Sequence, residues 1–514
     1  MQSFRYVPHD SLPALAWCAR IRRGSGVATV FHGMEVETSP GFFAEAAWNG
    51  GLDAAGLRTA SVVCGTGGMI DASGLVFRAG TDGLCPLFSV RHRDVLHVSN
   101  SPVFALTAAG EKPDPLYPFY SHGLLRIFRR GVHGSRESLP TASPGVKLGV
   151  HFYVVVRIGP DLAMELEAPP AGDEPTDWRH YERLLEQAVR GVFANARDPA
   201  RHKAYVPIAQ VSRGYDSTAS AALAAAAGCV EAVTIRDSRA VDPARDDGTA
   251  TATRLGMCCR SFDRWDYRQR PEASDAECAF ATVTTAPAWL AIDGVFAGRL
   301  VVAGTHGDCT WDVSGGKTPS NDLERPAATA VVGVSGLEFR LRVGFLQLNP
   351  PTIGMRHARK VAAIGRSAEM RPWSIGGSYD RPVPRRIAED RGVPRSTFGM
   401  TKIAGGHSHF YRAETFSPAA LRDYDAFRTR SLAAAPALKR AVARLRCAAE
   451  QAAWLCLHEG RRRSAVAMLL PWQPVVVTGG RHSIPWRFRF VFQWVCDTLT
   501  PRYRLPEHEE DRTT

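Results

Sequence analysis

Short apolar runs separated by turn residues dominate the first ~160 residues. Runs of this length that contain β-branched and aromatic residues are typical of strands, and clusters of Gly, Asp and Arg between them are typical of turns. Their close spacing predicts a β-rich sheet or sandwich. The predicted strands are 75–77, 87–90, 95–98 and 149–156, and the predicted turns are 80–83 and 91–94.

The composition changes at residues 167–175, which are rich in Pro, Ala and acidic residues and predict a linker between domains. We expect a helix directly after this linker, because Thr176 or Asp177 can cap its first turn. Apolar residues then recur at helical spacing and form one face of the helix. They are Tyr181, Leu184, Leu185, Ala188 and Val192.

Strand and helix patterns alternate from there on, and this alternation predicts a parallel sheet with helices on both faces. The expected fold class is therefore α/β, with a β-rich domain in front of a doubly wound domain. A helical, Arg-rich region is expected to close the chain, with helix over 418–457. The alternating segments are strands 205–211, 231–235 and 300–303, and helices 218–227 and 249–255.

Composition narrows the class of protein. The chain has 514 residues, 45% apolar and 22% charged, which is ordinary for a globular protein of two to four domains. Its 11 cysteines form no C-x-x-C pair, so we expect a reduced, cytoplasmic protein without a disulfide framework. The N-terminus has no apolar signal core, and no apolar run has the length of a membrane span.

The net charge of +12 comes mostly from arginine, since only seven residues are lysine. No nucleic-acid-binding module accompanies the charge, so we expect no nucleic-acid partner and attribute the arginine content to coding bias. The scarcity of lysine makes a lysine at a chemically useful position more informative.

The segment 210–218 is the most informative stretch for function. It lies between a predicted buried strand and a predicted helix, so its turn places backbone N–H groups and a helix N-terminus at the carboxyl end of a strand. Ser212, Ser217 and Thr218 add hydroxyl donors, and Asp216 is suited to a magnesium ion that bridges carboxylate and phosphates. The alternative interpretation is an ordinary strand-to-helix turn capped by Ser or Asp.

The segment Ser212-Arg-Gly-Tyr-Asp-Ser217 resembles the Ser-Gly-Gly-x-Asp-Ser loop of the ATP pyrophosphatases. The chain around it is similar to the asparagine-synthetase-like group, which includes asparagine synthetases, β-lactam synthetases and lasso-peptide cyclases. Segments 80–88 and 95–100 are similar to the closing strands of that group's glutaminase-type first domain. One departure is Arg213, where the group usually has Gly; its side chain either crowds a phosphate or binds one.

The resemblance implies four regions. They are a degenerate class II glutamine-amidotransferase-like domain (1–166), the linker (167–175), an asparagine-synthetase-like ATP pyrophosphatase domain (176–410) and a helical, Arg-rich C-terminal region (411–514).

A second acidic position is expected at the same edge of the sheet. The segment 300–312 resembles the group's Gly-x-Gly-x-Asp segment, which makes Asp308 the second magnesium ligand beside Asp216. Ligands bind beyond the carboxyl ends of the strands in an open parallel sheet, so the two acids can face one site. The alternative for Asp308 is a solvated turn residue.

Glu338 lies in a segment that resembles the group's Glu-x-Arg-x-Pro-Phe-Leu-Asp sequence, although the Pro is missing and Gln347 replaces the Asp. Glu338 is therefore a candidate catalytic base. We favour the alternative, a structural ion pair with Arg340 or Arg342.

Lys402 is the second candidate catalytic residue. Segments 379–387 and 393–402 resemble the group's Arg-rich helix and the lysine-containing loop that follows it. The resemblance implies that Lys402 lies beside the α-phosphate and offsets charge that develops in the transition state.

The N-terminus lacks the glutaminase nucleophile of the group, a cysteine exposed once Met1 is removed, because residue 2 is Gln. Cys18 would require removal of the first 17 residues, and no cleavage signal is visible. We therefore expect no glutamine hydrolysis.

The sequence favours an ATP- and Mg²⁺-dependent enzyme that adenylates a small-molecule or peptide carboxylate and joins it to an amine. The main alternative is a non-catalytic homologue that binds a nucleotide or a partner. A third hypothesis, an RNA-modifying ATP pyrophosphatase, would require a nucleic-acid-binding module, and the sequence shows none. A homodimer is possible. In the favoured interpretation the nucleotide is held by Ser212, Gly214, Asp216, Ser217 and Thr218, the metal by Asp216 and Asp308, and catalysis involves Lys402 and Glu338.

Overall fold

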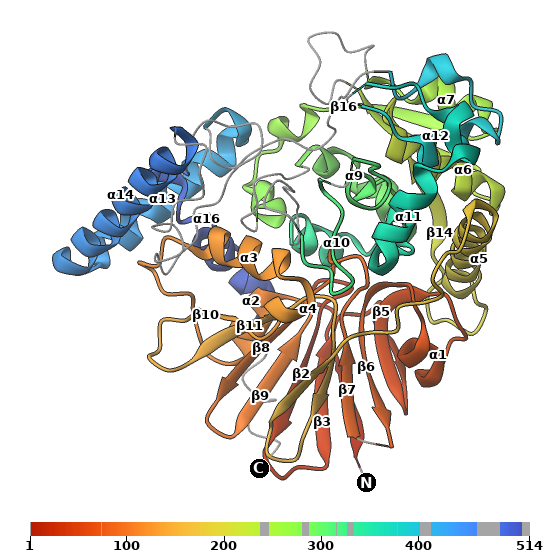
Figure 1. The fold of residues 1–514 in the computed structure, drawn as a ribbon. Helices are drawn as coiled ribbons and strands as arrows, with labels where there is room; N and C mark the ends of the chain where they lie inside the picture. Colours follow the sequence, from red (N-terminus) through yellow and green to blue (C-terminus); the bar gives the residue numbers. More distant parts are fainter. Residues whose placement is uncertain are drawn as a thin grey trace.

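Three sheets organise the protein, and the fold is α/β (Figure 1). The computed structural model describes residues 2–72, 74–236, 246–279, 287–314, 316–325, 334–377, 379–400, 413–459 and 484–505. Within these residues, no helix combines the length and the apolar character that a membrane crossing requires.

The first two sheets confirm the β-rich pattern of the N-terminal region. They pack face to face, and Trp17 from one sheet stacks on Phe77 from the other with ring centroids 5.9 Å apart. One sheet has the order β1 (Ser3–Pro8), β3 (Val27–His32), β2 (Trp17–Arg22), β9 (Val95–Ser99), β8 (Leu87–His92), β11 (Lys147–His151) and β10 (Ser138–Pro140). The other has the order β13 (Met164–Glu167), β12 (Val155–Ile158), β7 (Gly74–Arg78), β6 (Val63–Asp71), β5 (Phe42–Trp48) and β4 (Glu37–Ser39).

The single strand predicted over 149–156 is wrong, because this segment supplies two strands to different sheets. The chain changes sheet at Tyr153, whose φ is +58°. The buried Tyr153 hydroxyl accepts a hydrogen bond from Arg325 (2.9 Å), and this contact holds the side chain at the sheet junction. An apolar run can therefore contain a strand break that its composition does not reveal.

Short helices cover the ends of these sheets. Among the described residues of this region they are α1 (Ala54–Thr59), α2 (Pro102–Ala108), α3 (Tyr120–Arg129) and α4 (Gly131–Gly134). The sheet region ends at β13, and residues 168–177 form neither helix nor strand before α5 (Trp178–Ala196). Asp177 caps α5 by accepting a hydrogen bond from the His180 amide (2.8 Å), as one of the two predicted caps.

The third sheet is parallel throughout, as the alternating pattern predicts. The chain enters at its centre in β14, continues outward to β15 and β16, and then crosses to β17 and β18 on the other side. Its topological switch point therefore lies between β14 and β17, where ligands of open α/β sheets bind. The order is β16 (Cys258–Asp263), β15 (Glu231–Arg236), β14 (Val206–Gln210), β17 (Arg299–Val302) and β18 (Leu346–Leu348).

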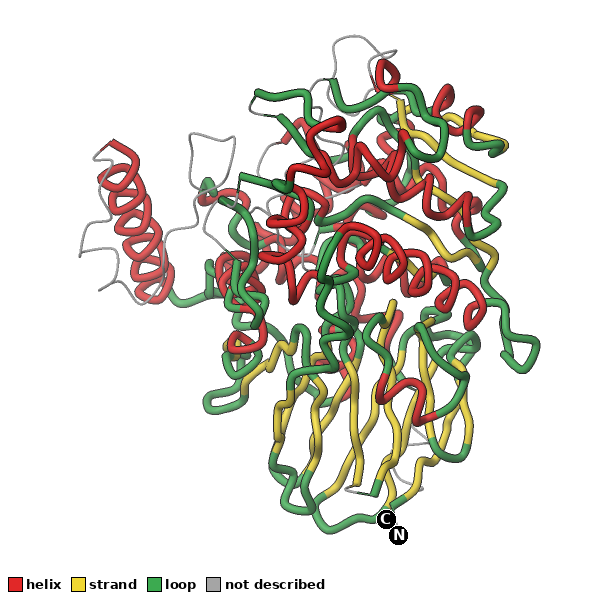
Figure 2. Tube along the Cα trace, turned by 45° about the vertical axis from the view of Figure 1, so that its right-hand side comes forward, coloured by secondary structure: helices red, strands yellow, loops and turns green. Residues whose placement is uncertain are grey.

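Helices flank this sheet, whereas the described helices after residue 417 lie on the other side of the molecule, near α2 and α3 (Figures 1 and 2). The helix predicted over 418–457 is in fact two helices, because Pro436 has no N–H to continue the first one. The helices are α6 (Tyr215–Ala226), α7 (Thr249–Arg254), α8 (Asp293–Phe296), α9 (Gly307–Thr310), α10 (Leu337–Val343), α11 (Ala358–Gly365), α12 (Pro382–Glu389), α13 (Pro418–Ala434), α14 (Ala437–Glu459) and α16 (Val491–Leu499).

Candidate functional site

The turn from β14 to α6 has the geometry of an anion site. Gly214 is the N-cap residue of α6 and offers no side-chain cap, so the first turn of the helix keeps amide donors available to an anion. The Ser212 hydroxyl lies 2.7 Å from the Ser217 hydroxyl and accepts a hydrogen bond from the Gly214 amide (3.2 Å). Thr218 is buried and donates its hydroxyl to the Ser212 carbonyl (3.1 Å), so it supports the turn from inside.

A second turn, from β17 to α9, packs directly against the first. A Cβ atom on Gly304 would overlap the backbone of Asp216 and Ser217, and one on Gly307 would overlap the Asp216 carboxylate. Asp308 follows Gly307 in the first turn of α9. The structure thus brings the two predicted magnesium ligands onto loops in contact, at the switch point of the sheet.

Cations already lie beside both carboxylates. Arg381 donates from Nη1 to both oxygens of Asp216 (2.7 and 2.8 Å), and the Lys317 ammonium lies 3.4 Å from Asp308. Burial alone would lower the pKa of Arg381, but the Asp216 and Asp308 carboxylates raise it above its ordinary value. Both acids therefore stabilise the positive charge of Arg381. The sequence analysis did not identify this residue as part of the site.

Two carboxylates suit a magnesium ion only if phosphate oxygens complete its shell. Within the described ranges, no group of three or more His, Cys, Asp and Glu side chains forms a metal site. Magnesium in nucleotide sites commonly takes one or two protein carboxylates together with substrate phosphates and water. The carboxylates of Asp216 and Asp308, beside the amide donors at the N-terminus of α6, fit that arrangement.

Arg213 does not strain the turn. Its φ is not positive, so glycine is not required there. Its guanidinium donates from Nε to the Thr397 carbonyl (3.4 Å), and its own carbonyl accepts a hydrogen bond from the Gly399 amide (2.8 Å). The segment that leads to Lys402 thus contacts the turn between β14 and α6 (residues 212–217), which we call the phosphate loop after the motif that it resembles. Lys402 itself lies outside the described residues.

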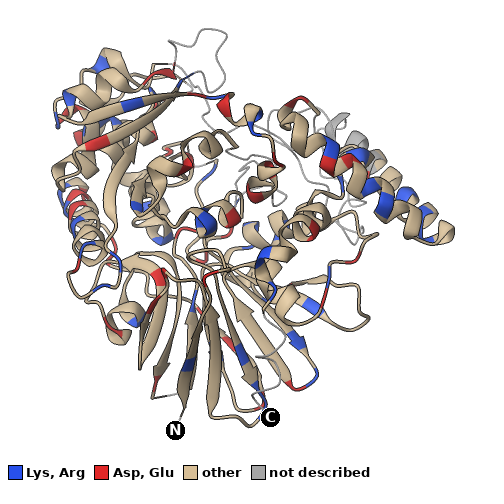
Figure 3. Cartoon of the chain, turned by 180° about the vertical axis from the view of Figure 1, so that it is seen from behind, with Lys and Arg blue, Asp and Glu red and all other residues tan. Residues whose placement is uncertain are grey.

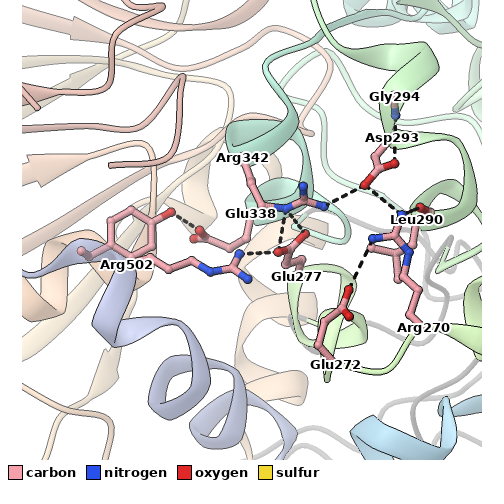
Figure 4. A network of polar contacts seen from close by, with 10 residues as sticks. Arg270, Glu272, Glu277, Leu290, Asp293, Gly294, Glu338, Arg342 and Arg502 are labelled. Atoms are coloured by element: carbon pink, nitrogen blue, oxygen red, sulfur yellow. Dashed lines mark hydrogen bonds and ion pairs between the residues drawn. The ribbon is translucent and has the colours of Figure 1, made fainter. Parts of the chain in front are cut away.

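Glu338 is buried at the junction of three chain regions (Figure 4). It accepts a hydrogen bond from the Ser101 hydroxyl at the start of α2 (2.6 Å) and another from the Tyr503 hydroxyl near the C-terminus. Burial raises the pKa of Glu338 to about 7. Ser101 and Tyr503 do not belong to the phosphate loop, so the role of Glu338 as a catalytic base stays a prediction.

The predicted ion pair of Glu338 with Arg340 or Arg342 is not the arrangement in the structure. Arg340 binds Glu45 of β5 (2.5 and 3.2 Å), and Arg342 binds Glu277 (2.7 and 2.8 Å). Each arginine pairs with a residue that lies far from it in the sequence.

A buried chain of amide and carboxyl groups links the second turn to the N-terminal sheets. The Gln347 amide donates to Thr305 Oγ1 (3.4 Å) and to Asn349 Oδ1 (2.9 Å), and the Asn349 amide donates to Asp82 (2.7 Å). Burial raises the pKa of Asp82 to about 6. The motif residue Gln347 therefore bridges the site and the N-terminal region, a role that only its distant partners reveal.

The structure places Cys18 in β2 with its side chain fully buried. Burial raises the pKa of the Cys18 thiol well above its ordinary value. A buried, protonated thiol is a poor nucleophile.

Comparison of the sequence with models of known protein families finds no match. A search of functionally curated proteins finds no match either.

Proposed function

We propose that this protein is an ATP-dependent carbon–nitrogen ligase that forms AMP and pyrophosphate. A substrate carboxylate attacks the α-phosphorus of ATP, pyrophosphate leaves, and an amine then displaces AMP from the acyl-adenylate. The reaction requires mostly positioning and neutralisation of charge, which backbone amides, hydroxyls and cations at a helix N-terminus supply.

One observation carries the proposal: the phosphate loop and the Gly304–Asp308 turn are in contact at the switch point of a parallel sheet. In the proposal, Ser212, Gly214 and Ser217 hold the pyrophosphate group. Asp216 and Asp308 hold magnesium, which supplies charge neutralisation when it is bound.

The resemblance to asparagine-synthetase-like enzymes extends the proposal to the whole chain, with a glutaminase-like first domain, an ATP pyrophosphatase domain and a cytoplasmic location. In the proposal, the amine comes from the substrates themselves and not from glutamine, and the fully buried Cys18 thiol is a poor nucleophile for glutamine hydrolysis. The substrate class is a small-molecule or peptide carboxylate.

The test is magnesium-dependent exchange of labelled pyrophosphate into ATP with a panel of carboxylates. Asp216→Asn and Asp308→Asn should each lower the exchange rate, because each removes one metal ligand. Asp312→Asn is the matched control, because this acid follows α9 and hydrogen-bonds to Ser314 (2.5 Å). Full exchange in both ligand variants would refute the metal assignment.

A separate prediction concerns Lys402, the lysine that the resemblance places beside the α-phosphate. Lys402→Met should lower the rate of AMP formation by roughly 10²–10³, the usual effect of removing one donor to a developing charge. Binding of ATP should change far less, because this interaction strengthens only in the transition state. Lys147→Met, at an exposed residue at the start of β11, is the control, and unchanged AMP formation in Lys402→Met would remove Lys402 from the mechanism.

A second candidate function is nucleotide binding without catalysis, and the Arg381–Asp216 contact favours it. An arginine bound to both carboxylate oxygens competes with a metal for the same ligand. This candidate predicts ATP binding that does not depend on magnesium, together with no pyrophosphate exchange for any carboxylate.

A further inference from the structure

Helix α14 exposes a stripe of apolar side chains over its first turns. Leu438 and Leu445 are 77% and 71% exposed, the highest values among the large hydrophobic residues that the structure describes, and Val442 is 42% exposed. The spacing of four and three residues places all three on one face of the helix. Ala441 and Ala449, also exposed, widen the stripe.

The opposite face of α14 is anchored to the body of the protein. Ala443, Cys447 and Glu450 are buried. Glu450 accepts a hydrogen bond from the buried His122 ring of α3 (2.9 Å) and forms an ion pair with the buried Arg489. The apolar stripe therefore lies on the outer face of a helix whose inner face is held in place.

Basic side chains border the stripe. Residues 437–449 contain no acidic residue, and three of their basic residues, Lys439, Arg444 and Arg446, lie beside the stripe. At about 100° per residue, Lys439 and Arg446 lie on one side of the stripe and Arg444 lies on the other. Figure 3 shows this basic helix projecting from the side of the molecule.

We propose that the outer face of α14 docks on the surface of an anionic phospholipid membrane. A helix that lies in the membrane interface has this construction: an apolar face enters the boundary of the acyl chains, and lysine and arginine at its flanks meet anionic headgroups. The proposal concerns the membrane surface only, and it does not depend on the proposed catalytic function.

Charge complementarity favours an anionic membrane over two other binding partners, a second copy of α14 and an RNA strand. A second copy of α14 would bring two sets of three flanking cations together across the contact, and like charges disfavour that pairing. An RNA strand would require the cations at the centre of the contact face, where they reach phosphates, whereas Leu438, Val442 and Leu445 occupy the centre here.

The experiment is co-sedimentation of the full-length protein with phosphatidylcholine vesicles, with and without roughly one-third phosphatidylserine. We expect binding to the anionic vesicles, weakened by salt, and much weaker binding to the neutral ones. Lys439→Gln combined with Arg446→Gln should weaken binding to the anionic vesicles by roughly 30-fold, from about 1 kcal/mol per charge. Leu438→Ser combined with Leu445→Ser should abolish binding to both.

The matched controls are Arg5→Gln combined with Arg91→Gln, two exposed arginines of the N-terminal sheet, and Val230→Ser at a residue 65% exposed. These controls should bind like the wild type. Three results overturn the proposal: vesicle binding that the leucine variant retains, a dimer that dissociates in the leucine variant, or a leucine variant with a strongly lowered unfolding temperature. The last would show that the chain itself buries this face.

Discussion

The Asp216 carboxylate is the side chain on which the proposed metal site most depends, and a cation already binds both of its oxygens. Arg381 and a magnesium ion would neutralise the same two acids. In the proposed metal site, the two cations would therefore compete for these acids before the nucleotide arrives.

Arg381→Gln should lower the free energy of unfolding by about 1–3 kcal/mol in the absence of magnesium, because it leaves a half-buried carboxylate without its partner. Millimolar magnesium should then raise the unfolding temperature of this variant more than that of the wild type. Thermal unfolding with and without magnesium measures both effects. Arg371→Gln, at an exposed residue, is the control; an equal response to magnesium in all three proteins would contradict the competition.

The pKa of Glu338, raised to about 7 from its ordinary value of 4.5, links this residue to the pH dependence of stability. Between these two values the folded protein binds more protons than the unfolded chain, so the contribution of Glu338 to stability falls as the pH rises from about 4.5 to about 7. Glu338→Gln removes this dependence. Relative to the wild type, the variant should gain about 1–3 kcal/mol in unfolding free energy between pH 5 and pH 8.

Urea unfolding of both proteins at pH 5, 6, 7 and 8 measures this difference. For Glu165→Gln, at an exposed position in β13, the free energy of unfolding should differ from that of the wild type by the same amount at every pH. If the difference between Glu338→Gln and the wild type is also the same at every pH, the folded protein does not raise the pKa of Glu338.

At the scale of elements, the site depends on the close packing of two turns. Gly307→Ala introduces a methyl group where the Asp216 carboxylate lies, although the backbone of Gly307 is not left-handed and accepts alanine. Overpacking of this kind costs about 1–3 kcal/mol, so pyrophosphate exchange should fall roughly tenfold or more. Gly294→Ala on α8 is the control, because no atom lies within 4 Å of its added Cβ. Equal exchange rates for the two variants would show that the packing of the two turns does not affect pyrophosphate exchange.

At the scale of the molecule, a buried ion pair joins the β-rich region to the α/β region. The side chains of Glu45 and Arg340 are 0% and 5% exposed. Glu45→Gln leaves the Arg340 charge buried without a partner and should lower the free energy of unfolding by about 3–5 kcal/mol. Asp94→Asn removes the partner of Arg23 in an exposed pair and should cost at most about 1 kcal/mol. Urea denaturation compares the two variants, and similar losses would show that the buried pair contributes no more to stability than the exposed pair.

Much of the fold follows from local pattern. The predicted strands at β14, β15 and β17, the predicted helices at α6 and α7, the Asp177 cap and the turn between β14 and α6 agree with the structure, because periodicity and capping involve residues close together in the chain. The short strands β16 and β18 were not predicted. The same local reasoning was wrong at Tyr153 and at Pro436. At Tyr153 a distant arginine holds a left-handed residue in place, and at Pro436 a single missing N–H ended a helix within a favourable pattern.

Local sequence patterns identify the loops that contain the candidate site residues, whereas long-range packing sets the partner of each side chain. Arg381 lies 165 residues from Asp216, and Ser101 lies 237 residues from Glu338. Such partners depend on the order of strands in the parallel sheet and on its contact with the N-terminal sheets. Neither the periodicity nor the charge of a segment specifies which distant residue will lie against it, because that depends on how the whole chain packs.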